Sequence, residues 1–154
     1  MKFTSAQVFR EALKDQCIKN GYDIDFIWKE NTRITTKCKK KGCNWRIHAS
    51  PIINNKTFQI KTIKGNHTCS RTYDNSLAKT KYLAKRMKDA IRDNPNIPID
   101  QLKNIIMRKC KVDVSRWKVM RAKKEVIDAF REVNVFQYKK IWGYCETVRA
   151  KNPG

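Results

Sequence analysis

Hydrophobic and polar positions follow two different periods along this chain, and the change of period divides it into predicted elements. Between residues 5 and 20 the apolar positions recur at helical spacing. Thr4 or Ser5 can cap the start of a helix there, and Gly21 can end it. Between residues 22 and 69 the period becomes two, which indicates strands. The predicted strands cover residues 22–29, 33–37, 44–52 and 57–63, with turns at Asn54-Asn55-Lys56 and Gly65-Asn66.

The helical period returns after residue 76. Asn94-Pro95 ends the first predicted helix of this region, and Pro98 begins the next. Ser115 can cap a further helix. The predicted helices cover residues 77–93, 98–110, 116–133 and 137–149. In the third of them, the apolar side chains expected to face inward are Trp117, Met120, Val126, Ile127 and Phe130.

These patterns predict an α+β fold. A small antiparallel sheet with an N-terminal helix would form one domain over residues 1–75, and a basic helical domain would follow over residues 76–150. Residues 151–154 read as a linker. Because four short strands bury little by themselves, the sheet needs an additional source of stability.

Four residues of the predicted sheet region form a complete set of zinc ligands: Cys38, Cys43, His67 and Cys69. The first two bracket a turn with glycine at its end. The other two lie two residues apart, so on an extended strand their side chains point to the same face. Three thiolates and one imidazole fill a tetrahedral site, which is typical of structural zinc that stabilises a small sheet. His48 is expected to be an ordinary strand residue, because the ligand set is already full.

Disulfides are the alternative use of the cysteines. The chain has six, an even number that a secreted domain would pair. The N-terminal segment MKFTSAQVFR lacks the apolar core of a signal peptide, which argues against that context. We therefore favour zinc over disulfides or free thiols. Cys17 is expected to be a small buried hydrophobe on the apolar side of the first helix.

The net charge of +21 is the second strong signal. The excess is spread along the chain, because residues 1–75 carry 15 basic and 6 acidic residues and residues 76–154 carry 20 and 8. Such a chain attracts polyanions, and nucleic acid is the default partner. No apolar run approaches membrane-spanning length, and the basic residues are not backed by one continuous amphipathic anchor, so a membrane is not expected as a partner. A small-molecule substrate is not expected either.

A four-residue turn at 111–114 joins two of the predicted helices, and the second of them carries a basic set: Arg116, Lys118, Arg121, Lys123 and Lys124. This arrangement suggests a DNA-binding helix-turn-helix. An ordinary helical hairpin with a basic solvent face fits equally well, since the motif has no sharp spacing signature. Both interpretations stay open.

Catalysis is not expected from this chain. Acidic residues that metal-dependent chemistry could use are present, for example Asp89, Asp93, Asp100, Asp113 and Asp128. They lack the convergent arrangement that a two-metal site needs and read as helix caps and ion-pair partners. Four tryptophans could stack on single-stranded bases: Trp28, Trp45, Trp117 and Trp142. Core positions are the favoured interpretation, because most of them lie on apolar stripes.

Several segments resemble the N-terminal DNA-binding region of plant Mutator-like (MuDR-type) transposases. The most specific are KCKKKGCNWRIHAS, GNHTCSR and SRWKVMRAK, in that order. The likeness continues through LAKRMKDAIRDNP and IWGYCETVRAKNPG and so covers nearly the whole chain. The resemblance implies a nuclear location and a zinc fold of the WRKY and GCM superfamily, with zinc on the four ligands named above.

In that superfamily one strand enters the DNA major groove. The corresponding strand here is 22–29, which lacks the WRKYGQK-type sequence and carries Asp23 and Asp25. Contacts to double-stranded DNA are therefore expected from nearby basic residues: Lys29, Arg33, Lys37, Lys39, Lys40 and Arg46.

The resemblance implies a zinc-dependent domain that recognises transposon terminal inverted repeats. In such transposases an RNase H-like catalytic domain follows, so we expect this chain to be the non-enzymatic recognition part, with any self-association through parts not present. Two alternatives stay open: a transposase-derived transcription factor that binds promoter DNA, and a binder of single-stranded nucleic acid or RNA.

Overall fold

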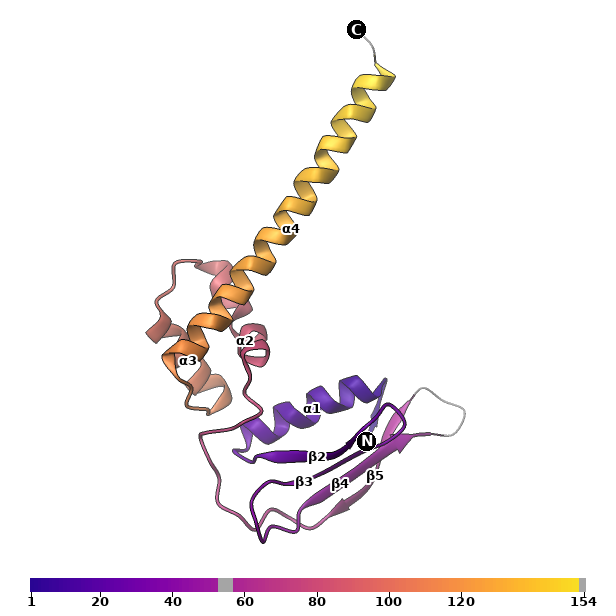
Figure 1. Ribbon diagram of the computed structural model, residues 1–154, viewed down its shortest axis with the longest axis vertical. Helices are drawn as coiled ribbons and strands as arrows, with labels where there is room; N and C mark the ends of the chain where they lie inside the picture. The colour runs from indigo at the N-terminus through magenta and orange to yellow at the C-terminus, as the bar shows by residue number, and fades with distance from the viewer. Residues whose placement is uncertain (53–56, 153–154) are drawn as a thin grey trace. The chain divides into compact units, whose positions relative to one another are not determined.

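A computed structural model describes residues 1–52 and 57–152, and these residues form one five-stranded antiparallel sheet and four helices (Figure 1). The predicted α+β class is confirmed. The strands are β1 (Lys2–Phe3), β2 (Ile24–Lys29), β3 (Ile34–Cys38), β4 (Arg46–Pro51) and β5 (Phe58–Lys64). The helices are α1 (Ala6–Lys19), α2 (Thr80–Asp93), α3 (Ile99–Cys110) and α4 (Arg116–Lys151). The turn predicted at Asn54-Asn55-Lys56 lies outside the described residues.

The sheet has the order β1-β5-β4-β3-β2, and every neighbouring pair is antiparallel. The four predicted strands are present, but the expected four-stranded meander gains β1 as a fifth strand. Lys2 pairs with Gln59 and Phe3 with Phe58. A strand of two residues is too short to show an alternating pattern, which is why the sequence did not reveal it.

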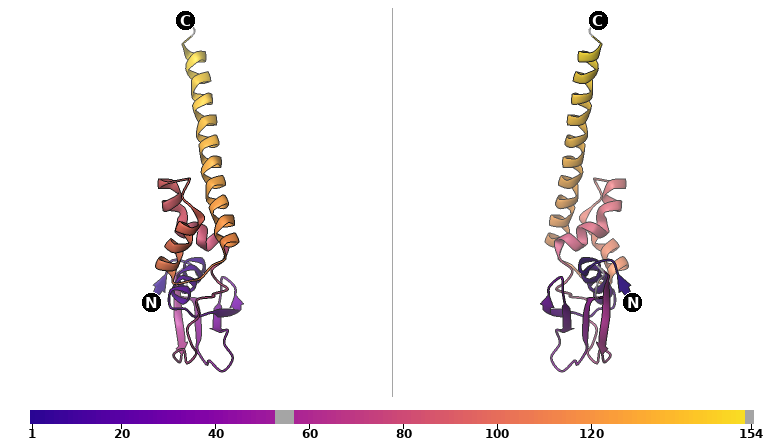
Figure 2. Two further views of the ribbon diagram at one scale, coloured as in Figure 1. Left: turned by 90° about the vertical axis from the view of Figure 1, so that its left-hand side faces the viewer. Right: turned by 90° about the vertical axis from the view of Figure 1, so that its right-hand side faces the viewer.

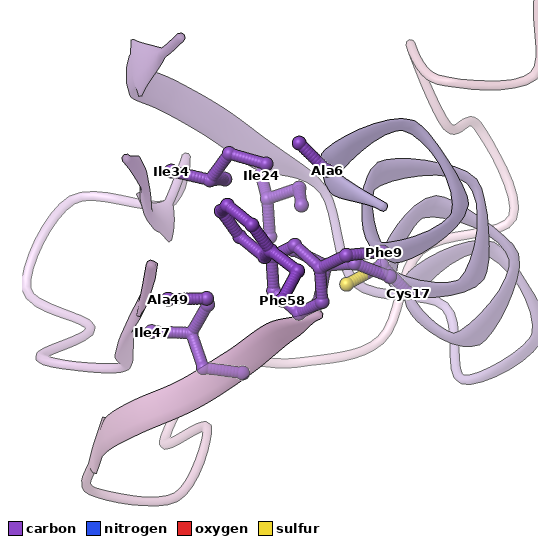
Figure 3. Close-up of a cluster of buried hydrophobic side chains, with 9 residues drawn as sticks. Ala6, Phe9, Cys17, Ile24, Ile34, Ile47, Ala49 and Phe58 are labelled. Carbon is purple, nitrogen blue, oxygen red and sulfur yellow. The ribbon is translucent and has the colours of Figure 1, made fainter. Parts of the chain in front are cut away.

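Helix α1 packs against one face of the sheet and builds the core of this part of the chain. The Ser5 hydroxyl accepts a hydrogen bond from the Val8 amide and so caps the helix, as predicted. The helix ends at Lys19 with Asn20 as its C-cap, and Gly21 follows in the left-handed conformation at φ +74°. Figure 3 shows Phe9 and Cys17 of α1 turned toward the apolar side chains of the strands.

The opposite face of the sheet, which we call the open face, is recognised by its cross-strand register. Lys37, Arg46 and Lys64 are aligned across β3, β4 and β5, and next to them lie Thr35, His48 and Thr62. Bulges interrupt the ladders between Phe26 and Trp28 and between His48 and Ala49. Trp28 pairs with Thr35 and therefore belongs to the open face as well.

The chain divides into two compact units. One contains residues 1–79 and 103–114, and the other contains residues 80–102 and 115–154. In the first unit, the Asp113 amide donates to the Tyr73 carbonyl at 2.9 Å, which ties the segment after α3 to the loop that follows the sheet. In the second unit, α2 packs along α4.

Helix α4 corrects one sequence prediction. Helices were expected at 116–133 and 137–149, but a single uninterrupted helix spans both, as both views of Figure 2 show. The intervening residues Asn134, Val135 and Phe136 include neither proline nor glycine, so nothing breaks the backbone ladder. The Ser115 hydroxyl caps the helix by accepting from the Lys118 amide, as predicted.

The inward side of α4 is also corrected. Trp117 and Met120 were expected to be buried but are 71% and 42% exposed, whereas Val119 and Ala122 are fully buried. Val126 is buried as predicted, and Ile127 and Phe130 are half-buried. The buried stripe is thus rotated relative to the predicted one, toward smaller side chains.

Among the described residues, no helix is long and apolar enough to cross a lipid bilayer.

Candidate metal centre

The structure brings Cys38, Cys43, His67 and Cys69 together at one end of the sheet. Their nearest potential ligand atoms all lie within 4.8 Å of one another. The Cys38 and Cys69 sulfurs are 3.6 Å apart, and His67 Nδ1 lies 3.6 Å from Cys43 Sγ and 3.9 Å from Cys69 Sγ. Residues separated by up to 31 positions in the sequence therefore converge on one small volume.

The donor set and its spacing fit a tetrahedral metal ion. Zn–S bonds of about 2.3 Å and Zn–N bonds of about 2.0–2.1 Å place neighbouring ligand atoms of a tetrahedron roughly 3.5–3.8 Å apart. Two of the separations, 3.6 Å each, fall within that range, and the third, 3.9 Å, lies just above it. A disulfide does not fit, because its sulfurs lie about 2.05 Å apart. All six cysteines are free, and Cys17 is buried, as expected.

The Cys38–Cys43 segment folds as a tight turn that points backbone amides at sulfur. The Cys43 amide donates to the Lys40 carbonyl at 3.3 Å, and Gly42 adopts φ +79°, a conformation that favours glycine. The Lys40 amide donates to the Cys38 sulfur, and the amides of Trp45 and Thr68 donate to the Cys43 sulfur. Three N–H dipoles therefore face two sulfurs, an arrangement that stabilises thiolates.

The two thiols of this turn differ in acidity. The Trp45 N–H, the largest influence, lowers the pKa of Cys43 to about 5, whereas burial raises the pKa of Cys38 to about 12. The lowered pKa of Cys43 favours the thiolate form that binds metal, and the raised pKa of Cys38 means that metal binding to that thiol would release a proton.

His67 is clamped between two aromatic rings. The Tyr22 ring stacks on the imidazole at a centroid distance of 3.8 Å and an interplanar angle of 6°, and Trp45 stacks at 4.4 Å and 18°. This sandwich fixes the plane of the ring, so that Nδ1 faces the sulfurs. The sequence did not reveal either ring as a partner of His67, because Tyr22, Trp45 and His67 lie outside the strands in segments far apart in the chain.

Asp23 ties the loop after the ligands to the sheet. Its carboxylate accepts from the Ser76 amide at 3.2 Å and from the Ser76 hydroxyl at 2.9 Å. It also forms an ion pair with Lys39 at 3.4 Å. Nearby, the Asn75 side chain donates to the Tyr22 carbonyl at 2.9 Å. Asp23 thus has a structural role.

The basic residues predicted to contact DNA do not form one group. Arg33, Lys37 and Arg46 belong to the open face, where the Arg33 guanidinium stacks on Trp28 at 3.8 Å. Lys39 is held by Asp23 and donates to the Ser76 hydroxyl. Lys29 lies over the Phe26 ring, which packs against the core under α1, and Lys40 is exposed in the cysteine turn.

The five basic residues predicted to bind DNA from α4 also differ in their surroundings. Arg116 pairs with Asp100 at 3.2 Å, and Lys123 donates to the Ile97 carbonyl at 2.8 Å. Arg121 and Lys124 line a hollow of about 450 Å³ that also holds Glu125, Asp128 and Glu132. Lys118 is half-buried near the start of the helix. Acidic neighbours therefore accompany much of this surface.

Two further predictions have outcomes here. His48 Nδ1 lies 2.8 Å from the Thr35 hydroxyl, outside the ligand cluster, as expected for an ordinary strand residue. The favoured core interpretation of the tryptophans is wrong for Trp28, Trp117 and Trp142, which are 43%, 71% and 67% exposed. Trp45 is half-buried against His67.

Comparison with known proteins bears on the first part of the chain. Residues 1–60 match the family model described as MuDR family transposase, a model of the DNA-binding domain. The match confirms the resemblance over that segment, which contains Cys38 and Cys43 and ends before His67 and Cys69. No curated protein and no solved structure matched the chain.

Proposed function

We propose that this chain is the zinc-dependent DNA-binding region of a Mutator-like transposase and that it recognises transposon terminal inverted repeats. The observation that carries the proposal is the convergence of Cys38, Cys43, His67 and Cys69 beside a basic sheet, in a chain whose residues 1–60 match the MuDR DNA-binding model. We assign the sheet unit to the WRKY and GCM type of zinc fold, and the site of action to the nucleus.

The metal in this proposal is structural zinc. The four side chains would occupy every position of a tetrahedral ion, whereas catalytic zinc keeps one position open for water or substrate. When bound, the ion would contribute folding free energy to a sheet whose core is small. The proposed function is therefore binding, without a reaction.

Double-stranded DNA is the proposed partner because the charge of the chain suits it. A net charge of +21 favours the release of counterions from a phosphate backbone, which makes binding strongly dependent on salt. We propose residues 1–75 as the principal recognition domain and residues 76–150 as a second basic domain. The proposed contacts are Lys29, Arg33, Lys37, Lys39, Lys40, Arg46, Arg116, Lys118, Arg121, Lys123 and Lys124.

The test is selection of bound sequences from a random duplex pool by the whole zinc-loaded chain, repeated after zinc is chelated. We expect zinc-dependent enrichment of one motif that also occurs in the terminal inverted repeats of a Mutator-like element. A motif found only in promoters would favour the transcription-factor alternative. Preferential capture of single strands would contradict the proposal, and the exposed Trp28 and its Arg33 partner make single strands the proper competitor.

A nicking assay with Mg²⁺ or Mn²⁺ addresses the proposed absence of catalysis. We expect supercoiled plasmid to stay intact with the purified chain. Metal-dependent nicking that copurifies with the chain would contradict a purely binding function.

A further inference from the structure

The open face of the sheet carries a row of positive charge built by strand register. Lys37, Arg46 and Lys64 are neighbours across β3, β4 and β5, and all three side chains are exposed. Directly opposed residues in such a ladder have Cβ atoms about 4.5–5.5 Å apart, so three like charges are crowded together at a cost in stability. Within the described residues, no carboxylate forms an ion pair with any of the three, although Asp25 pairs with Lys37 in the ladder.

Two of these cations share a hollow with an imidazole and a hydroxyl group. Arg46, His48, Thr62 and Lys64 line a depression of about 270 Å³ on the open face. The hydrogen bond between the His48 ring and the Thr35 hydroxyl, at 2.8 Å, holds the imidazole in position. A guanidinium, an ammonium and a hydroxyl around one concavity offer the charge-assisted donors that a phosphate group accepts best.

The proposed metal ligands stand next to the same row in the sequence. Lys37 immediately precedes Cys38, Arg46 follows Cys43 by three residues, and Lys64 precedes His67 by three. The proposed metal ligands hold the ends of β3, β4 and β5 together. They therefore also keep Lys37, Arg46 and Lys64 in register. The surrounding structure holds the three positive side chains together despite their mutual repulsion. A bound anion would relieve that repulsion.

We propose that the open face is the surface that meets the DNA backbone and that the hollow between Arg46, His48, Thr62 and Lys64 holds one backbone phosphate. The inference rests on the proposed DNA-binding function and deepens it, because it assigns the contact to the open face of the sheet. It also adds Lys64 and Thr62, which the sequence did not single out, and His48, which was expected to be an ordinary strand residue. Contacts of this kind fix the register of the protein on the duplex, while base edges supply specificity.

The experiment compares two doubly neutralised chains with the zinc-loaded wild type. Arg46→Gln with Lys64→Gln removes the two cations of the hollow. The control, Lys14→Gln with Lys79→Gln, removes the same charge on the α1 side of the unit, where Lys14 lies over Phe26 and feels the charge of Lys79. Zinc content and circular dichroism establish that both variants are folded. Affinity for a duplex is then measured by anisotropy over a range of salt concentrations.

The open-face variant should bind about tenfold more weakly at physiological salt, and its slope of log K against log salt should fall by about 1. The control should keep nearly the wild-type slope. If both double variants match each other in affinity and slope, the inference is overturned while the DNA-binding function stands. If the wild-type chain binds no duplex at all, both fail together.

Discussion

At the scale of single residues, the aromatic clamp on His67 determines how the candidate metal centre is oriented. The imidazole of His67 can rotate about the single bonds of its side chain, and such a rotation would move Nδ1 away from the sulfurs. Tyr22 at 3.8 Å and Trp45 at 4.4 Å prevent this by stacking on both faces of the ring. The clamp therefore prepares the ligand before any ion arrives, which lowers the cost of ordering the site.

Replacing Tyr22 tests the clamp. Tyr22→Ala should weaken zinc affinity by up to about tenfold, since an aromatic pair contributes roughly 0.5–1.5 kcal/mol beyond area burial. Tyr22→Phe keeps the ring and should bind zinc like the wild type. Competition with a chromophoric chelator measures both. Equal losses in the two variants would show that the hydroxyl, and not the stacked ring, supports the site.

A ligand substitution tests the metal centre itself. Cys43→Ser should abolish stoichiometric zinc and unfold the sheet unit, while α2 and the long α4 keep much of the helical signal. Cys145→Ser is the matched control, because Cys145 is exposed on α4 and lies outside the cluster. Elemental analysis and amide spectra read the outcome. Retained zinc and an unchanged amide spectrum in Cys43→Ser would refute the assignment.

At the scale of elements, the junction between α1 and β2 depends on one glycine. Gly21 has φ +74°, and an added Cβ would lie 3.1 Å from the Arg71 Cβ and 3.2 Å from the Thr72 carbonyl oxygen. The Thr72 amide also donates to the Gly21 carbonyl at 2.8 Å. A side chain at this position would therefore strain the backbone and push away the segment that follows Cys69.

Two glycine-to-alanine substitutions should have opposite effects on stability. Gly21→Ala should destabilise the sheet unit by about 1–2 kcal/mol, the cost of left-handed backbone for a residue with a Cβ. Gly143→Ala, inside α4 with open space around the new methyl group, should raise helix stability by up to about 1 kcal/mol. Thermal melts followed by circular dichroism compare them. A neutral Gly21→Ala would mean that this junction relaxes freely.

The basic surface of α4 can be tested apart from its structural contacts. Arg121→Gln with Lys124→Gln leaves the Arg116–Asp100 ion pair and the Lys123–Ile97 hydrogen bond in place. If α4 contacts DNA, the salt slope should fall by about 1 to 2. An unaltered slope would identify α4 as scaffold and favour the helical hairpin over the helix-turn-helix.

At the scale of the whole molecule, sequence periodicity predicted most of the elements but few of the contacts between them. The period of two predicted β2 to β5 because one sheet face is buried under α1, and ligand chemistry alone selected Cys38, Cys43, His67 and Cys69. The pattern could not reveal the Tyr22–His67–Trp45 stack, because the three residues lie outside the strands, in segments far apart in the sequence. The burial of Trp117 was predicted wrongly, since an apolar residue on a helix does not by itself specify what covers it. The length of α4 was also predicted wrongly, although residues 134–136 include neither proline nor glycine.

The same limit applies to the candidate DNA surface. Charge counting selected Lys37 and Arg46 but also Lys39, which the structure assigns to an ion pair with Asp23. Lys64 was passed over because nothing in its local sequence distinguishes it, yet register sets it beside Arg46. Which cations act together is therefore a property of the assembled sheet.

The most direct test of a metal-held DNA-binding sheet is the affinity of the whole chain for a DNA duplex, measured as a function of salt concentration with zinc bound and after chelation. If a metal-held sheet is the DNA-binding surface, chelation should weaken binding and flatten the salt slope together, and restoring zinc should recover both. Isotherms that stay superimposed with and without zinc, while elemental analysis shows the metal leaving, would contradict it.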